Sequence, residues 1–166
     1  MNLIPLEGTT VAEMAATPEG LYAVASDITR IGDWSHECKG ATWHGGAQGP
    51  AVGARFRGRN RIGWRRWSRL CEVTVLDPPN RLAWRTVGAM GWVDSTEWQL
   101  TFTGLEDGRT RVTQHYRVVK NNPVLRRFYS LIVPTHVNRS AALTADLVRL
   151  GEVATTESTA PRPAAS

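Results

Sequence analysis

Residues 53–67, with the sequence GARFRGRNRIGWRRW, alternate between two kinds of side chain. Arginines stand at every second position from 55 to 61, and the positions between them hold Phe56, Gly58 and Asn60. A period of two sends successive side chains to opposite faces of a strand, whereas a helix would scatter the arginines around its circumference. The stretch therefore predicts a strand with one arginine-covered face, a turn near Gly63, and a second strand that begins at Arg65.

The same period continues downstream of this hairpin. In the segment 92–103, one face carries Trp98, Leu100 and Phe102 and the other carries polar residues, as in an antiparallel sheet with one buried face. Turn sequences such as DPPN at 77–80 separate the segments. We expect strands at 9–15, 54–61, 65–76, 81–87, 92–103 and 109–119.

Two helices are predicted from the residues of their first turns. Thr17-Pro18 combines a hydroxyl N-cap with a proline at the first helical position, and Asn122-Pro123 repeats the pattern later in the chain. An apolar stripe then predicts one long helix from about Pro123 to Leu150, and Pro134 should bend it. The stripe consists of Leu125, Phe128, Tyr129, Ile132, His136, Leu143, Leu147 and Leu150.

Length and composition bound the class of protein. A length of 166 residues suits one domain, and 42% hydrophobic with 21% charged residues is ordinary for a globular chain. We expect this domain at 1–152 and a disordered polar tail at 153–166. The sequence shows neither a signal peptide nor an apolar run long enough to span a membrane, so a cytoplasmic location with Cys38 and Cys71 reduced is expected.

The order of these elements predicts the architecture. The long C-terminal helix has the length and the apolar stripe that are needed to cover one face of the sheet. The expected fold is therefore α+β, with a curved antiparallel sheet wrapped around that helix. A gap between a curved sheet and a single helix is a natural ligand pocket.

Several short motifs resemble those of a known family. They are Asp27-Ile28, Asp33-Trp34, the sequence VGARFRG at 52–58, Trp67, DPP at 77–79, Arg81-Leu82, Trp98, and GRTRVT at 108–113. Over residues 8–152 the chain is similar to the START-like (SRPBCC) superfamily, specifically its bacterial polyketide cyclase/dehydrase branch. This resemblance implies a helix-grip (Bet v 1-like) fold with an apolar cavity under the C-terminal helix. It also implies binding of lipids, polyketides or other hydrophobic molecules, and some members of the family are cyclases.

Strand phase predicts which side chains face that cavity. If Phe56 points inward, Asn60 does too, while Arg55, Arg57 and Arg59 point to solvent. The same reasoning applied to the other strands and to the helix gives a set of aromatic and polar residues. The predicted ligand-binding residues are Trp34, Phe56, Asn60, Trp67, Arg69, Trp84, Trp98, Gln114, Tyr116, Phe128, Tyr129, Ile132 and His136.

A structural role is the alternative for each of these residues. The aromatic residues can simply fill the core, since aromatic side chains dominate core burial. The polar members, Asn60, Arg69, Gln114 and His136, need partners if they are buried, because an unpaired buried polar group costs about 1–3 kcal/mol. They can orient a ligand, or they can satisfy one another.

The sequence offers few candidates for chemistry. Acid–base catalysis would have to use His136, Tyr116 or Tyr129, with Arg69 stabilising an enolate. A nucleophile formed by Cys71 and His136 has no supporting signature. His36, Cys38 and His44 match no zinc spacing, so no metal and no cofactor are predicted.

Three functions remain in competition. The leading hypothesis is a binding protein for a hydrophobic small molecule, and it is favoured over turnover. The second is a cyclase or dehydratase that uses the same cavity. The third is binding of nucleic acid or an acidic surface through the arginine hairpin, which a net charge of +5 permits. Nucleic acid is disfavoured because the sequence has no RNP-like, helix-turn-helix or zinc-finger pattern.

Overall fold

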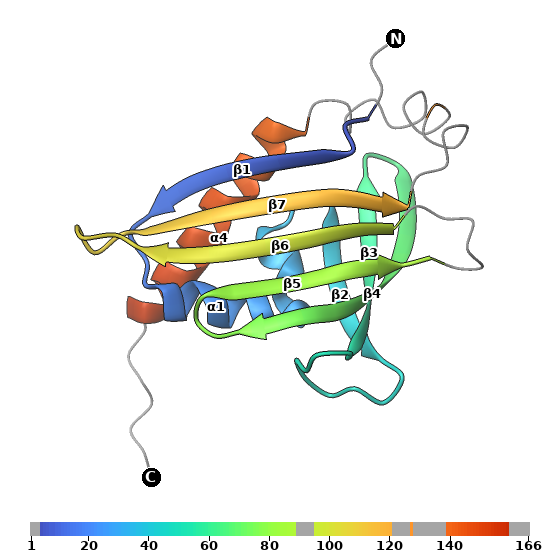
Figure 1. Ribbon diagram of the computed structural model, residues 1–166, viewed down its shortest axis with the longest axis horizontal. Coiled ribbons are helices and arrows are strands. Elements are labelled where there is room, and N and C mark those ends of the chain that lie inside the picture. The colour runs from blue at the N-terminus through green and yellow to red at the C-terminus, as the bar shows by residue number, and fades with distance from the viewer. Residues whose placement is uncertain (1–3, 89–94, 121–126, 128–138, 160–166) are drawn as a thin grey trace.

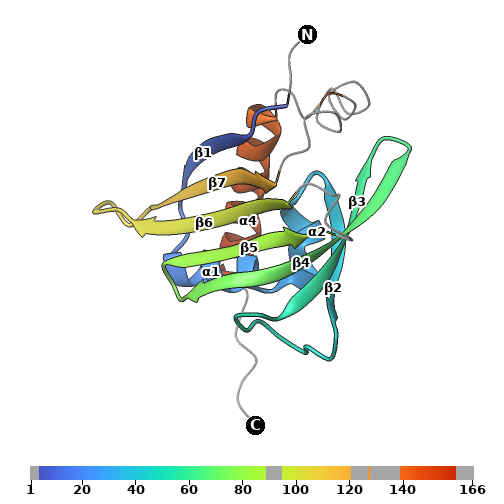
Figure 2. The same ribbon diagram turned by 45° about the vertical axis from the view of Figure 1, so that its right-hand side comes forward.

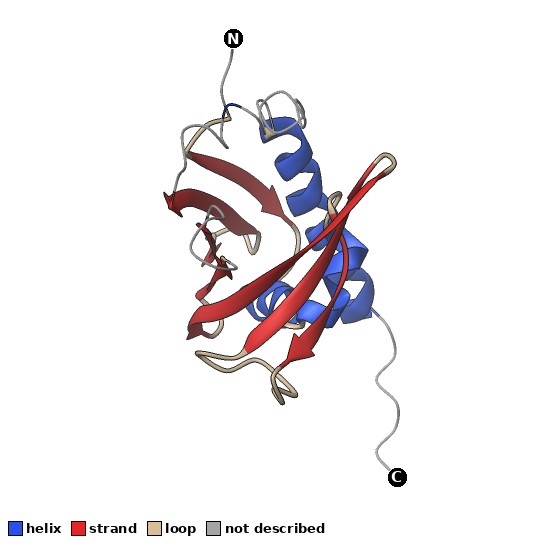
Figure 3. Cartoon of the chain, turned by 90° about the vertical axis from the view of Figure 1, so that its right-hand side faces the viewer, coloured by secondary structure: helices blue, strands red, loops and turns tan. Residues whose placement is uncertain are grey.

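The computed structural model shows a curved antiparallel sheet with helices on its inner side (Figure 1 and Figure 3). It describes residues 4–88, 95–120, 127 and 139–159. Seven strands in this part of the chain form one sheet in the order β1-β7-β6-β5-β4-β3-β2. The predicted fold class is confirmed.

The elements are bounded as follows. The strands are β1 (Glu7–Met14), β2 (Cys38–His44), β3 (Arg55–Ile62), β4 (Arg65–Asp77), β5 (Arg81–Val87), β6 (Ser95–Gly104) and β7 (Thr110–Lys120). The helices are α1 (Pro18–Ser26), the 3-10 turn η1 (Ile28–Arg30), α2 (Ile31–Trp34) and α4 (Ser140–Thr159).

The first helix begins as the sequence predicts. The Oγ1 atom of Thr17 accepts a hydrogen bond from the backbone N–H of Gly20 at 3.2 Å, which satisfies one of the free donors of the first turn. Pro18 occupies the first helical position. The helix buries an apolar face against the sheet and α4, formed by Leu21, Tyr22, Val24 and Ala25.

The arginine hairpin has the predicted register. Phe56 is 2% exposed, and its neighbours Arg55 and Arg57 are on the solvent side, as is Arg59. The turn is two residues long, and its first residue, Gly63, has φ +59°, a left-handed conformation that suits glycine.

The edge strand β2 was not predicted. It is seven residues long, pairs with β3 alone, and has a register shift between Cys38 and Gly40. An interrupted edge strand of this kind lacks a clean period of two, because a bulge changes the face on which later side chains emerge. Sequence pattern alone therefore does not reveal it.

The predicted C-terminal boundary is wrong. The helix was expected to end at Leu150 and the tail to begin at residue 153, yet α4 continues through Gly151 to Thr159. Gly151 lies inside α4, and a Cβ atom there would lie 2.7 Å from Sδ of Met14. Glycine instead allows α4 to approach β1 closely, and Ala154 beyond it is buried. The earlier part of the predicted helix, including Pro134, lies outside the described residues.

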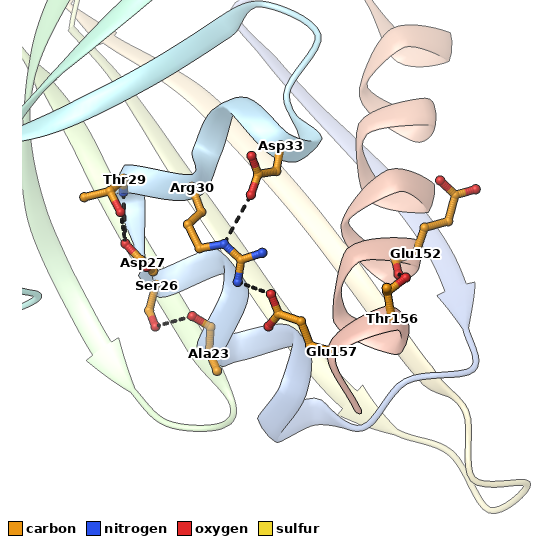
Figure 4. A network of polar contacts seen from close by, with 9 residues as sticks. All are labelled: Ala23, Ser26, Asp27, Thr29, Arg30, Asp33, Glu152, Thr156 and Glu157. Carbon is orange, nitrogen blue, oxygen red and sulfur yellow. Dashed lines mark hydrogen bonds and ion pairs between the residues drawn. The ribbon is translucent and has the colours of Figure 1, made fainter. Parts of the chain in front are cut away.

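The C-terminal half of α4 is tied to the short helices by charge (Figure 4). Arg30 donates from Nε to Asp33 at 3.2 Å and also pairs with Glu157 near the end of α4. The hydroxyl of Thr156 donates to the carbonyl of Glu152 at 2.8 Å, within the last turns of α4. Thr156 and Glu157 lie within the predicted disordered tail, yet these contacts fix their positions.

None of the helices in the described part of the chain is long and apolar enough to cross a membrane.

Candidate functional site

A cavity of about 680 Å³ lies between the inner face of the sheet and the helices α2 and α4. Nine of the predicted ligand-binding residues are described, and all nine line it. They are Trp34, Phe56, Asn60, Trp67, Arg69, Trp84, Trp98, Gln114 and Tyr116. The other four, Phe128, Tyr129, Ile132 and His136, lie outside the described residues.

Strand register brings the aromatic residues together. Trp84, Trp98 and Tyr116 are direct cross-strand partners on β5, β6 and β7, so they form one row across the inner face. The ring centroids of Trp98 and Tyr116 are 5.3 Å apart. On the neighbouring pair of strands, Phe56 lies opposite Cys71 in the same way.

The aromatic residues serve as core and cavity wall at once. Trp34, Phe56 and Trp84 belong to the main hydrophobic cluster, and each also borders the cavity. The structural alternative is therefore correct in part, because burial of these rings stabilises the fold. The cavity nevertheless remains open beside them.

Two buried polar atoms of the wall lack hydrogen-bond partners among the described residues. Trp34 is 3% exposed and its Nε1 is unpaired, while Gln114 is 4% exposed and its Oε1 is unpaired. Native proteins rarely leave such atoms unpaired, because each costs about 1–3 kcal/mol. One donor and one acceptor are thus available to a molecule in the cavity.

Arg139 is a wall residue that the sequence analysis missed. Its Cζ lies 5.0 Å from the ring centroid of Tyr116 and 5.6 Å from that of Trp98, so the guanidinium makes two cation–π contacts. Its Nε is also buried without a hydrogen-bond partner in the described part of the chain. The residue immediately precedes α4 and lies within the helix predicted at 123–150, but as a charged residue it was not included in the apolar stripe.

A histidine–aspartate pair in the wall was also missed. Asp146 of α4 is 2% exposed, and its carboxylate accepts from the backbone N–H of His36 at 2.8 Å and from His36 Nδ1 at 2.7 Å. The hydrogen bond to Asp146 raises the pKa of His36 above its ordinary value, against an opposing effect of burial. His36 entered the sequence analysis only as a rejected zinc ligand, and its partner is 110 residues away.

The Cys71 thiol is not a reactive nucleophile. Burial raises the pKa of Cys71 to about 12, so the thiolate is scarce near neutral pH. Cys38 and Cys71 are both free thiols. Within the described ranges, no cluster of three or more His, Cys, Asp or Glu side chains is placed to hold a metal ion.

The wall therefore combines an apolar surface with a small number of fixed polar groups. Such a site can hold an apolar molecule and orient it through hydrogen bonds. Arg69, Tyr116 and the His36–Asp146 pair add groups that can stabilise negative charge or exchange a proton.

Comparison with known families and structures adds independent information. The sequence model of a family described as "Polyketide cyclase / dehydrase and lipid transport" matches residues 6–155. No curated protein matches the chain significantly.

Solved structures share the fold. TTHA0849 from Thermus thermophilus is 19% identical with a TM-score of 0.70, and the match covers 92% of this chain and 99% of that one. The Zhui aromatase/cyclase from Streptomyces sp. R1128 is 16% identical with a TM-score of 0.68, covering 93% and 96% of the two chains. The Polyketide_cyc-like protein Cgl2372 from Corynebacterium glutamicum is 27% identical with a TM-score of 0.59, covering 93% and 94%.

The His36–Asp146 pair predicts how stability depends on pH. Because the pKa of His36 is raised in the folded state, its contribution is complete below the pKa of an unfolded histidine and is lost as the pH rises through the folded pKa. We expect His36→Ala to lower the free energy of unfolding by about 1–3 kcal/mol at pH 5.5 and by less at pH 9. Urea unfolding at both pH values measures this difference. His44→Ala, at an exposed histidine, is the control, and an equal cost of His36→Ala at both pH values would contradict the ionic pair.

Proposed function

The chain belongs to the polyketide cyclase / dehydrase and lipid transport family, and from that premise we propose that it binds a hydrophobic small molecule in the cavity under α4. The observation that carries the proposal is an aromatic cavity of about 680 Å³ whose wall includes buried polar atoms without partners among the described residues. Pockets for small organic molecules typically measure about 300–1,000 Å³ and combine these two features.

The unpaired atoms indicate what the molecule carries. The Oε1 atom of Gln114 can accept a hydrogen bond, so it suits a hydroxyl group of the ligand. The Nε1–H of Trp34 can donate, so it suits a carbonyl or hydroxyl oxygen. Pairing both atoms on binding would remove a cost that the free protein bears, and this favours an oxygen-bearing hydrophobic ligand such as a polyketide or an oxygenated lipid over a pure hydrocarbon.

A pair of adjacent substitutions tests whether the cavity is the binding site. Val118 lines the cavity, whereas its neighbour Val119 is 42% exposed on the opposite face of β7. We expect Val118→Trp to weaken binding of the neutral dye phenylnaphthylamine at least about tenfold, since overpacking costs about 1–3 kcal/mol. Val119→Trp should bind the dye as the wild type does. Dye fluorescence titration measures both, and equal binding by the two variants would place the dye elsewhere.

A cyclase or dehydratase reaction in the same cavity is the second candidate function. The observation that favours it is the His36–Asp146 pair, which lies in the wall of the cavity. With Nδ1–H donating to Asp146, the neutral ring would have Nε2 free to accept a proton, so His36 replaces the undescribed His136 as the proposed base. In a dehydration, His36 would take the proton α to a ketone, the C–H electron pair would form the C=C bond as the β-hydroxyl leaves, and the protonated ring would return that proton to the leaving hydroxyl to release water.

Turnover has its own test. An aromatic β-hydroxy ketone is the probe, and the absorbance of the conjugated enone follows its dehydration. If the enzyme hypothesis is right, wild type catalyses the reaction and His36→Gln loses it at least about a hundredfold, the usual contribution of general acid–base catalysis. Phenylnaphthylamine binding is measured on the same variant, so that loss of the site is distinguished from loss of catalysis. If wild type binds the dye but dehydrates the ketone no faster than His36→Gln does, the enzyme hypothesis is wrong for this class of substrate. The cavity would then bind such molecules without converting them.

A further inference from the structure

Arg139 lines the cavity and carries a positive charge that no described acidic residue neutralises. No ion pair joins it to an acidic residue in the part of the chain that the structure describes, and its Nε is buried and unpaired. The rings of Tyr116 and Trp98 hold the guanidinium by cation–π contacts, which leave its N–H donors free. Arg139 is half-buried, so its charge is partly removed from water, and an anion that pairs with it would offset that cost.

Most of the other charged side chains that line the cavity are also positive. Its arginines are Arg65, Arg66, Arg69 and Arg139, and its acidic residues are Glu37 and Asp146. Asp146 is already bonded to His36, so its negative charge is largely compensated. The field inside the cavity therefore favours a negative group, and low-dielectric walls strengthen that preference.

We infer that the ligand of this cavity is a hydrophobic anion whose acidic group binds Arg139. The inference rests on the proposed binding function and narrows it to amphipathic acids. A carboxylate can accept bidentate hydrogen bonds from a guanidinium. The row of Trp84, Trp98 and Tyr116 would contact the apolar part of the molecule.

Two dyes with the same aromatic skeleton distinguish the effect of ligand charge on affinity from the effect of hydrophobicity. Anilinonaphthalene sulfonate carries one sulfonate that phenylnaphthylamine lacks. We expect wild type to bind the sulfonate dye at least about tenfold more tightly, the gain of a charge-assisted hydrogen bond of about 1.5–3 kcal/mol. Arg139→Gln should abolish that preference, measured as the ratio of the two dye affinities within the variant, and Arg139→Lys should retain part of it. Arg149→Gln, at an exposed arginine on α4, the helix that follows Arg139, is the control.

The outcomes distinguish this inference from the function on which it rests. Equal binding of the two dyes to wild type overturns the anion preference and leaves the binding function intact. A preference that survives in Arg139→Gln overturns the role of Arg139. Failure of wild type to bind either dye overturns both the binding function and the inference.

A separate observation concerns the tip of the β3–β4 hairpin, which projects beyond the rest of the sheet (Figure 2). Trp64 lies in the turn of this hairpin and is 83% exposed. The Cζ atom of Arg65 lies 5.3 Å from the centroid of the Trp64 ring. Arg61 and Arg66 are direct cross-strand partners, and no described acidic residue forms an ion pair with either. Like charges placed opposite each other destabilise a hairpin, so this tip is suited to an anionic partner.

The same tip borders the cavity. Trp64, Arg65 and Arg66 line it together with Leu6, which is 37% exposed. Tryptophan favours the interface between water and lipid, and basic residues near an anionic bilayer are attracted to its surface. A nucleic acid would match the arginines but would give no reason for apolar groups at the entrance to a cavity. We propose that the hairpin tip docks on an anionic lipid bilayer.

Vesicle sedimentation tests the docking. Wild type should sediment with vesicles of equal parts phosphatidylcholine and phosphatidylglycerol and remain in solution with phosphatidylcholine alone. Trp64→Ser should reduce sedimentation several-fold, and so should the double variant Arg61→Ser/Arg66→Ser.

Two matched controls should sediment as wild type does. They are Val52→Ser, at a valine 66% exposed in another loop, and Arg111→Ser/Arg117→Ser, which removes the same charge from β7. Equal loss in test and control variants, or no vesicle binding by wild type, would overturn the proposal. So would tight binding of a random oligonucleotide that Trp64→Ser leaves unchanged, since that outcome indicates a nucleic-acid site.

Discussion

The close approach of α4 to β1 at Gly151 separates the packed core of the protein from the cavity. A side chain at that position would collide with the side chain of Met14, so glycine lets α4 pack directly against that side chain of β1. Leu147 and Leu150 are fully buried around the contact and complete the hydrophobic core. Earlier in the same helix, Leu143 and Asp146 border the cavity instead. One helix thus closes the core at one end and forms the wall of an open space at the other.

The chemistry of the cavity follows from its low dielectric constant. Among the described residues, Trp34, Gln114 and Arg139 each bury one polar atom that has no hydrogen-bond partner. In contrast, Asp146 is fully engaged, since His36 donates to both of its oxygens. Stability and binding are therefore coupled, because a ligand that pairs the free groups removes a cost that the empty protein carries. The paired carboxylate holds the wall in place, and the unpaired groups are left to select among ligands.

Much of the fold was predictable from local pattern. The hairpin register, the Thr17 N-cap and the face on which Trp84, Trp98 and Tyr116 lie all follow from periods and capping residues that act over a few positions. The failures have physical causes. A bulge near Gly40 hid β2, and the helix was predicted to end just before Gly151, although that glycine lies inside α4 and serves a tertiary contact.

The sequence by itself determined which side chains share a face of the sheet, because a strand's period of two follows from backbone geometry alone. For that reason nine predicted residues border one cavity. Tertiary structure alone decided the polar partnerships. His36 contacts Asp146, which is 110 residues away in the sequence, and Arg139 lies over the rings of Tyr116 and Trp98. Both contacts depend on the position and orientation in which α4 packs against the sheet. That placement depends on the packing of side chains from β1, α1 and α2 together, and no local pattern in the sequence encodes it.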